Sequence, residues 1–249
     1  MSKTIFITGA TSGFGEAIAR KFGQNGYNLI ILGRRKDRLQ NLTNEFKDIK
    51  IHQICADVRD KEAIFDAIEN LPDEFKNIDI LVNNAGLALG QDKFMQANLD
   101  DFEVMIDTNI KGVIYVTKAT LPYIKKGGFI ANIGSVAGNW SYEGSSVYGS
   151  SKAFIRQFSL NLRNDLKGTG IRVTNIEPGL CKTEFSIIRF KGDIKKANSI
   201  YENTQFIKAS DIARIVFEIS QLPQNLNINT IEVMATTQSW AGFYNEKLD

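Results

Sequence analysis

The chain has 249 residues, of which 43% are hydrophobic and 23% charged, and its formal net charge is +2. These values are typical of a soluble globular protein, and the charge is too small to indicate nucleic-acid binding. His52 is the sole histidine and Cys55 and Cys181 are the only cysteines, which argues against a metal site, a disulfide framework and a Ser-His-Asp hydrolase.

Short apolar runs alternate with amphipathic segments along the whole chain. This order predicts an α/β fold, in which residues 1–249 form a single doubly wound, Rossmann-type domain with a seven-stranded parallel sheet. We expect strands at Thr4–Thr8, Asn28–Leu32, Lys50–Cys55, Ile80–Val82, Gly128–Ile133, Arg172–Glu177 and Thr230–Met234. We expect helices at Gly13–Asn25, Lys36–Phe46, Asp60–Leu71, Leu99–Lys125, Ser146–Leu166 and Ser210–Gln221.

Several features at the ends of these elements add to this prediction. Asp60 and Ser210 have side chains suited to capping the helices that begin there. The polar stretch 183–208 contains no strand pattern and is compatible with helix.

No apolar run is long enough to span a bilayer and the amino terminus lacks a secretory signal pattern, so we expect a cytoplasmic protein.

A glycine-rich turn, with Gly9, Gly13 and Gly15, connects the first strand to the first helix. Such a turn lets the backbone approach a pyrophosphate, which the free N–H groups and the dipole of the helix then bind. The spacing differs from the common Gly-x-Gly-x-x-Gly pattern, and glycines also form plain turns. Because a strand precedes this glycine-rich turn and a helix follows it, the turn predicts a nucleotide-binding site.

The end of the second strand predicts which nucleotide is bound. An acidic residue at this position binds the ribose hydroxyls of NAD, but here Gly33 is followed by Arg34 and Arg35. Guanidinium groups bind a 2′-phosphate through charge-assisted hydrogen bonds. A bound anion would also offset the unfavourable placement of arginine at a helix N-terminus. We therefore predict NADP rather than NAD.

Tyr148 and Lys152 lie four residues apart in an amphipathic pattern, so a helix would place both on one face. A phenol has a pKa of about 10, and a nearby ammonium favours the phenolate and lowers that pKa. The tyrosine could then act as a general acid or base, with Ser135 hydrogen-bonding the same substrate oxygen. Taken alone, the Tyr-x-x-x-Lys spacing is also compatible with an ordinary exposed helix.

These motifs occur in an order that resembles the short-chain dehydrogenase/reductase family over essentially the whole chain. The other matching residues are Asn83–Gly86, Asn109, Pro178 and Gly179. The resemblance implies hydride transfer with a nicotinamide, in which Tyr148 exchanges the proton and Ser135 stabilises the substrate oxygen. It also implies that Lys152 holds the nicotinamide ribose, that Asn109 supports a water relaying protons to Lys152, and that 183–208 is a mobile lid.

The resemblance further implies a set of cofactor contacts. Asp57 and Val58 would bind the adenine edge, Asn83, Ala85 and Gly86 the adenosine ribose, and the segment after Pro178 the nicotinamide and pyrophosphate. The complete expected NADP(H) set is Gly9, Thr11, Ser12, Gly13, Phe14, Gly15, Arg34, Arg35, Asp57, Val58, Asn83, Ala85, Gly86, Tyr148, Lys152, Pro178, Gly179, Cys181 and Thr183.

Local strings resemble one branch of the family, the NADP-dependent 3-hydroxy acid dehydrogenases. These strings are residues 78–90, 156–163, 189–193 and 237–242. This branch acts on small carboxylates with a β-hydroxyl, so Phe185 and Arg189 would complete the substrate site with Ser135 and Tyr148. Arg189 could pair with the substrate carboxylate. The loop 179–185 is one residue shorter than in relatives of this branch, which leaves substrate preference open.

Two alternative functions remain open on the sequence. The first is a 3-oxoacyl-thioester or general carbonyl reductase, and the second is a non-catalytic NADP(H)-sensing regulator. The helices expected at Leu99–Lys125 and Ser146–Leu166 carry more apolar residues than one sheet face needs. Because family members pair these helices across subunits, we expect a homotetramer, or otherwise a dimer.

Overall fold

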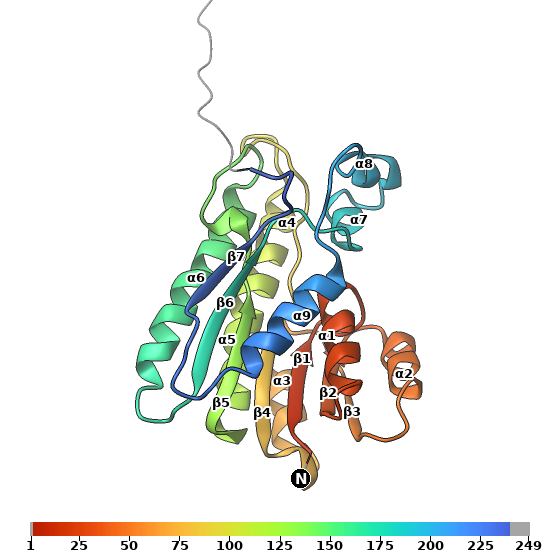
Figure 1. Cartoon of the computed structure of the whole chain (residues 1–249). Helices are drawn as coiled ribbons and strands as arrows, with labels where there is room; N and C mark the ends of the chain where they lie inside the picture. The colour runs from red at the N-terminus through yellow and green to blue at the C-terminus, as the bar shows by residue number, and fades with distance from the viewer. Residues whose placement is uncertain (1, 240–249) are drawn as a thin grey trace, which may run out of the picture.

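The computed structural model describes residues 2–239, and a parallel sheet of seven strands forms the centre of this part (Figure 1). The strand order is β3-β2-β1-β4-β5-β6-β7, as expected for a doubly wound sheet. The order reverses between β1 and β4, which is where open α/β sheets bind ligands. The strands are β1 (Thr4–Thr8), β2 (Asn28–Gly33), β3 (Ile51–Cys55), β4 (Ile78–Asn83), β5 (Ile124–Ile133), β6 (Arg172–Pro178) and β7 (Thr230–Val233).

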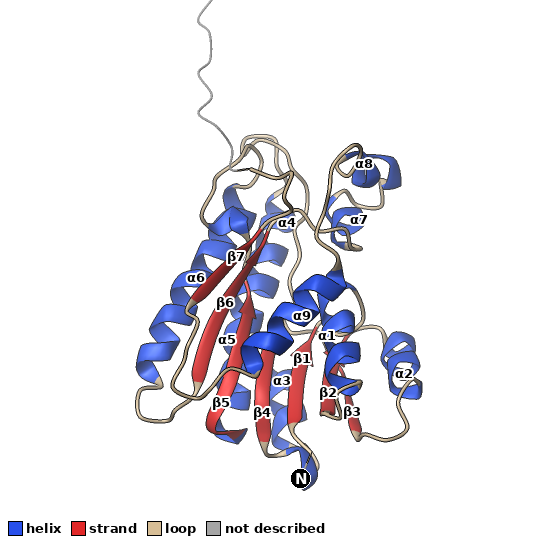
Figure 2. Ribbon diagram, viewed as in Figure 1, coloured by secondary structure: helices blue, strands red, loops and turns tan. Residues whose placement is uncertain are grey.

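Helices cover both faces of the sheet (Figure 2). One face carries α1 (Gly13–Gly23), α2 (Lys36–Asn44) and α9 (Ala209–Ser220). The opposite face carries α3 (Lys61–Glu69), α4 (Leu99–Ile106), α5 (Gly112–Thr120) and α6 (Ser146–Asp165). Two short helices, α7 (Phe185–Arg189) and α8 (Ile194–Ser199), lie beyond the carboxyl ends of the strands.

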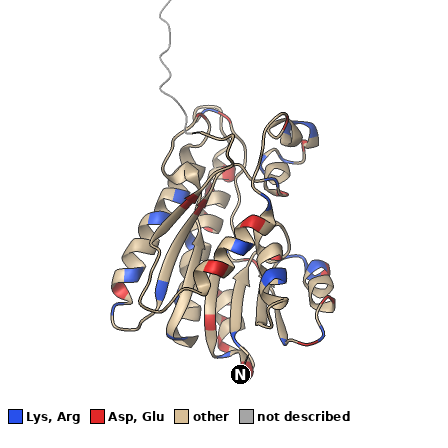
Figure 3. Cartoon of the chain, viewed as in Figure 1, with Lys and Arg blue, Asp and Glu red and all other residues tan. Residues whose placement is uncertain are grey.

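The strands are apolar on both sides because both sides are covered. In β1, Ile5 and Ile7 point into the core beneath α1 and α9, whereas Phe6 points into the core beneath α3 and α5. Charged residues therefore lie mostly on helices and loops (Figure 3). None of the helices in residues 2–239 combines the length and apolarity that crossing a bilayer requires.

The prediction of one helix at Leu99–Lys125 is wrong at its carboxyl end, and the helical segment is irregular in its middle. Between α4 and α5 lies a π-helical turn, η2 (Asp107–Lys111), and α5 is followed by the 3₁₀ turn η3 (Leu121–Tyr123). Pro122, which lacks an N–H, coincides with the end of the helix. Strand β5 then begins at Ile124 rather than Gly128, and the ammonium of Lys125 lies 3.2 Å from the carboxylate of Asp79.

The two expected caps differ in outcome. Asp60 accepts a hydrogen bond from the Ala63 N–H at 3.0 Å, as predicted. Ser210 is not an N-cap, because α9 begins at Ala209 and Asp211 instead accepts from the Lys208 N–H at 3.0 Å. The stretch 183–208 is partly helical, as expected. In the resemblance string 237–242, residues 240–242 lie outside the described residues.

Phe22 offers a test of this packing, because its fully buried ring contacts Tyr27 and Phe217 and joins α1 to α9. We expect Phe22→Ala to lower the free energy of unfolding by about 3–5 kcal/mol through lost burial and a residual cavity. Urea denaturation measures the change. The control, Phe94→Ala, removes a ring that is 67% exposed and should cost less than about 1 kcal/mol. Equal losses would contradict this account of the core.

Candidate active site

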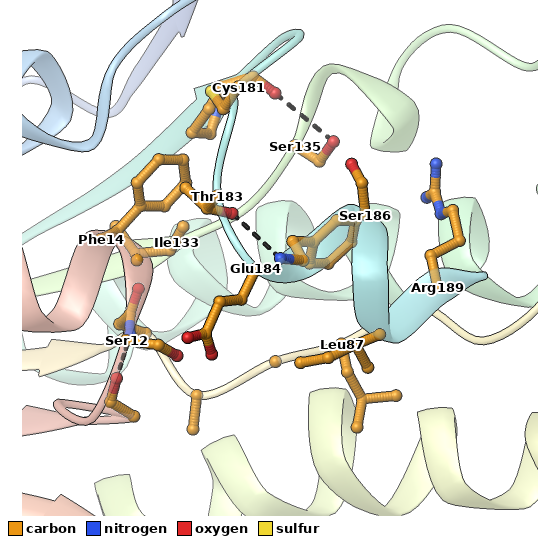
Figure 4. Close-up of a pocket in the computed structure, with 18 of the residues that line it drawn as sticks. Ser12, Phe14, Leu87, Ile133, Ser135, Cys181, Thr183, Glu184, Ser186 and Arg189 are labelled. Atoms are coloured by element: carbon orange, nitrogen blue, oxygen red, sulfur yellow. Dashed lines mark hydrogen bonds between the residues drawn. The ribbon is translucent and has the colours of Figure 1, made fainter. Parts of the chain in front are cut away.

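A cavity of about 680 Å³ follows the carboxyl ends of the central strands, at the reversal of strand order (Figure 4). All the residues expected to bind cofactor or substrate or to act in catalysis line this cavity, except Gly15, Asn83 and Asn109. The structure therefore brings together residues from the first turn of the chain to the segment that follows β6.

The glycine turn after β1 forms one wall of the cavity. Gly9 and Gly13 have φ angles of +66° and +54°, a region that favours glycine. A Cβ at Gly9 would lie 2.9 Å from Asn84 Nδ2. The turn and the start of α1 therefore leave a cradle that fits a diphosphate. Gly15 contributes differently, because a Cβ there would lie 2.2 Å from the Gly9 carbonyl oxygen, so it lets α1 approach the turn.

The two adjacent asparagines after β4 have different surroundings. Asn83 donates to Thr117 Oγ1 at 2.9 Å and to Asn132 Oδ1 at 2.8 Å, inside the protein. The expectation that it contacts the ribose is not supported, because the side chain ties β4 to its neighbours instead. Asn84, which the sequence analysis placed in a matching motif but gave no cofactor contact, lines the cavity and donates to the Thr8 carbonyl oxygen at 2.9 Å.

The two arginines after β2 also differ. The Arg34 side chain is 60% exposed, and within residues 2–239 its one polar contact is a long ion pair of 3.5 Å with Asp57. Arg35 donates to the Thr11 carbonyl oxygen at 3.0 Å and pairs with Glu184 at 2.9 Å. Of the two guanidinium groups predicted to bind an anion, Arg34 is therefore the accessible one.

Tyr148 and Lys152 lie on one face of α6, as their spacing predicted, and both are buried. The Lys152 ammonium lies 5.9 Å from the centre of the Tyr148 ring and donates to the Ile133 carbonyl oxygen at 2.8 Å. Ser135 follows β5, and its Oγ accepts from the Ala137 N–H at 3.1 Å. The end of β5 and the first turns of α6 thus position the three side chains.

The pKa values in this cluster differ from the sequence prediction. Burial raises the pKa of Tyr148 to about 12, partly opposed by the charge of Arg189 and by a hydrogen bond with Ser135. Burial thus outweighs the groups that lower the Tyr148 pKa, and the effect of Lys152 on that pKa stays a prediction. Burial lowers the pKa of Lys152 itself to about 8, because a low-dielectric environment disfavours its ammonium form.

Asn109 lies in η2, behind the cavity wall. Its Oδ1 accepts from the Leu87 N–H at 2.9 Å, and its Nδ2 donates to Ser151 Oγ at 3.0 Å. A Cβ at Gly86 would lie 3.3 Å from Asn109 Oδ1 and 3.4 Å from Lys152 Nζ. Asn109 is thus close to Lys152, and the π-helical turn η2 places its side chain there.

The substrate residues lie at one end of the cavity. The Phe185 ring centre is 5.6 Å from that of Tyr148, and the Arg189 guanidinium carbon is 4.9 Å from the Tyr148 ring centre. Arg189 donates to the Tyr142 hydroxyl at 3.0 Å, while its buried Nε has no partner among the described residues. Tyr142 was missed by the sequence analysis. Its one sequence feature is that it is an aromatic residue shortly before α6.

Tyr201 is a further residue that the sequence did not reveal. Its hydroxyl donates to the Cys181 carbonyl oxygen at 2.8 Å and shares a hydrogen bond with Ser186. It comes from the segment 183–208 and lines the cavity. Nothing in its sequence surroundings distinguishes it from a surface aromatic residue, because the contact depends on how that segment folds back.

A parallel sheet with a glycine cradle at its reversal point and a buried Tyr–Lys pair beside it defines a dinucleotide-dependent oxidoreductase fold. The chain belongs to the short-chain dehydrogenase family, whose sequence profile matches residues 3–193.

Named relatives agree with this membership. The chain is 53% identical to the NADP-dependent 3-hydroxy acid dehydrogenase YdfG of Escherichia coli K12, covering 96% of this chain and 97% of that protein. It is 48% identical to the serine 3-dehydrogenase of Agrobacterium fabrum, covering 98% of each. A solved structure described as the closed form of serine dehydrogenase complexed with NADP+ superposes with a TM-score of 0.94, at 51% identity, covering 98% of this chain and all of that one.

The buried ammonium of Lys152 gives a pH-dependent prediction. Its folded pKa of about 8 lies below the ordinary lysine value of 10.5, so the unfolded chain binds more protons between these values. Wild-type stability should therefore rise with pH across that window. We expect Lys152→Met to raise the free energy of unfolding by about 1–3 kcal/mol at neutral pH, a gain that shrinks toward pH 10.5.

Urea denaturation of both proteins at several pH values measures this gain. The matched control is Lys195→Met, which removes an exposed lysine of α8 and should leave the pH dependence unchanged. A gain that is the same at every pH would contradict the assignment to Lys152.

Proposed function

We propose that this protein is an NADP-dependent oxidoreductase that transfers hydride between the nicotinamide and the hydroxyl or carbonyl group of a small 3-hydroxy acid. The observation that carries the proposal is the cluster of Tyr148, Ser135 and Arg189 at one end of a cleft that presents Arg34 at the other. The family membership and the names of the relatives support the same activity.

The residues along the cleft fit NADP(H). Gly9 and Gly13 leave room for the diphosphate, and Arg34 offers an accessible guanidinium beyond β2. No acidic residue stands in the position that binds the ribose hydroxyls of NAD. Lys152 and the segment from Pro178 to Thr183 would hold the nicotinamide end. When bound, the cofactor supplies or accepts the hydride.

Tyr148 is the residue that exchanges the proton of the substrate hydroxyl. It donates this proton to the oxygen during reduction and removes it during oxidation. Ser135 hydrogen-bonds the same oxygen and stabilises the charge that develops on it. Lys152 orients the cofactor ribose, and Asn109 holds the loop next to the lysine and would support a water that relays protons to it.

Arg189 would bind the acidic group of the substrate, in a charge-assisted and often bidentate pair. Serine, 3-hydroxy acids and sulfoacetaldehyde, the substrate in the name of a 47% identical reductase of Chromohalobacter salexigens, share one chemical pattern. In each, a single carbon separates the anionic group from the reacting carbon. A guanidinium carbon 4.9 Å from the Tyr148 ring centre suits an anion at that separation.

We also propose that the protein is a cytoplasmic homotetramer, in which residues 1–249 form one domain and 183–208 is its substrate lid. Cys55 and Cys181 are both free, which suits a reducing compartment. Leu99 and Ile106 on α4 and Ile114 on α5 expose apolar surface that subunit contacts would bury.

An assay panel tests the substrate class. We expect NADP-dependent oxidation of serine, L-allo-threonine and 3-hydroxypropionate, measured as NADPH absorbance, with much lower activity on 3-oxoacyl thioesters. A preference for the thioesters would replace the proposal with an acyl-thioester reductase. Nucleotide binding without turnover on any of these compounds would instead indicate a regulator.

Tyr148→Phe should abolish turnover, by about 10³-fold or more, because the phenyl ring has no proton to exchange. Binding of NADPH should remain, since the ring still fills its buried position. Steady-state kinetics and NADPH fluorescence titration measure the two effects. Tyr123→Phe serves as the control outside the cavity, and activity retained in Tyr148→Phe would remove Tyr148 from its role.

Arg189→Gln should raise the KM for a 3-hydroxy acid by about 10–100-fold, because a hydrogen bond to a charged group contributes about 1.5–3 kcal/mol. The methyl ester of the same acid should be affected far less, since it lacks the charge. Loss of the guanidinium should also move the acid limb of the pH–rate profile upward, because Arg189 lowers the Tyr148 pKa. An equal loss on acid and ester would assign Arg189 to structure alone.

A further inference from the structure

Glu184 connects the segment after β6 to the loop after β2, at the adenosine end of the cleft. Its carboxylate lies 2.9 Å from Arg35 Nη1 and 2.6 Å from Arg38 Nη1. Figure 4 shows this side chain directed toward the Ser12 end of the cavity, while Arg189 lies at the opposite end. None of the contacts proposed above for cofactor or substrate uses Glu184 or Arg38.

Both arginines are fixed by further contacts. Arg35 donates to the Thr11 carbonyl oxygen at 3.0 Å, and Arg38 donates to the same oxygen at 3.2 Å. A single ion pair with these half-exposed groups would contribute little. Here two guanidinium groups share one carboxylate and one carbonyl oxygen, which is a network rather than an isolated pair.

The position of Glu184 in the chain connects this network of ion pairs to the substrate end of the cleft. It is the residue before α7, a helix of five residues that carries Phe185 and Arg189 over Tyr148. Thr183, on its other side, lies against Gly13, where a Cβ would be 3.3 Å from the Thr183 Cβ. A shift of Glu184 would therefore move both Phe185 and Arg189 relative to the catalytic tyrosine.

We propose that Glu184, Arg35 and Arg38 form a clasp that positions α7 over Tyr148, and that Arg34, rather than Arg35, selects for the 2′-phosphate of NADP. The proposal deepens the proposed function at its cofactor end and does not depend on which hydroxy acid is the substrate. Glu184 and Arg38 are positioning residues, because they act through the placement of Phe185 and Arg189.

The division between the two arginines follows from their partners. The Arg35 guanidinium is already engaged by Thr11 and Glu184, and a phosphate there would face the Glu184 carboxylate. Among the described residues, Arg34 has one polar side-chain partner, the distant carboxylate of Asp57, and its side chain is largely exposed. A dianionic phosphate would therefore find in Arg34 the more exposed cation, whose contact with the Asp57 carboxylate is longer than that of Arg35 with Glu184.

The clasp is tested first without cofactor or substrate, by hydrogen exchange of residues 185–201. We expect Glu184→Gln and Arg38→Gln to speed exchange there by about tenfold, and the double variant to add little to either single change. Glu202→Gln, which removes an exposed carboxylate from the same segment, is the matched control and should change nothing. Unchanged exchange in Glu184→Gln would overturn the clasp.

Kinetics then separate positioning from cofactor selection. We expect Glu184→Gln to raise the KM for a 3-hydroxy acid by about tenfold, while the Kd for NADPH changes by less than about threefold. Because exchange is measured on the nucleotide-free protein, failure of the proposed function would appear as inactivity on every substrate and leave the clasp result standing.

Arg34→Gln should lower the preference for NADPH over NADH, measured as the ratio of Kd values, by about 10²-fold, whereas Arg35→Gln should change that ratio by less than about threefold. Arg35→Gln should instead reproduce the faster exchange of Glu184→Gln. Two results would overturn the division of roles. One is an equal loss of preference in both arginine variants, and the other is NADPH binding that tightens fivefold or more in Glu184→Gln without a change for NADH.

Discussion

The burial of Tyr148 and Lys152 together on one face of α6 is the constraint on which the site depends. Removal from water disfavours the charged form of each group, so it raises the pKa of the phenol and lowers that of the amine. A guanidinium keeps its charge in such surroundings far better than an ammonium does. Arg189, at 4.9 Å from the Tyr148 ring centre, is accordingly the fixed positive charge beside the phenol.

The sheet explains how these groups come together. Parallel strands deliver their following loops to one edge, so the glycine turn after β1, the arginines after β2 and Ser135 after β5 meet there. The Asn84 side chain fixes part of this edge by donating to the Thr8 carbonyl oxygen. The result is a preformed cleft whose two ends carry different cations, Arg34 and Arg189.

The segment after β6 connects those two ends. Glu184 is bound at the adenosine side through Arg35, while Arg189 lies at the substrate side, five residues further along. Helix α7 is short and lies beyond the sheet, so it does not pack on the core as the longer helices do. Its position therefore depends on its contacts with residues of the cleft. The segment that follows β2 and the side chains that α7 carries over Tyr148 are therefore connected through Glu184.

The sequence by itself determined the sheet, the nucleotide cradle and the Tyr148–Lys152 face, because strand alternation, glycine conformation and helical spacing are local properties. It also placed Ser135 and Arg189 in the same region through family resemblance. Only the tertiary structure decided that Asn83 is a core residue, that Arg35 is held by Glu184, and that burial raises the Tyr148 pKa. These three properties depend on contacts between residues far apart in the chain and on the exclusion of water. Neither the distant contacts nor the burial leaves a local pattern in the sequence.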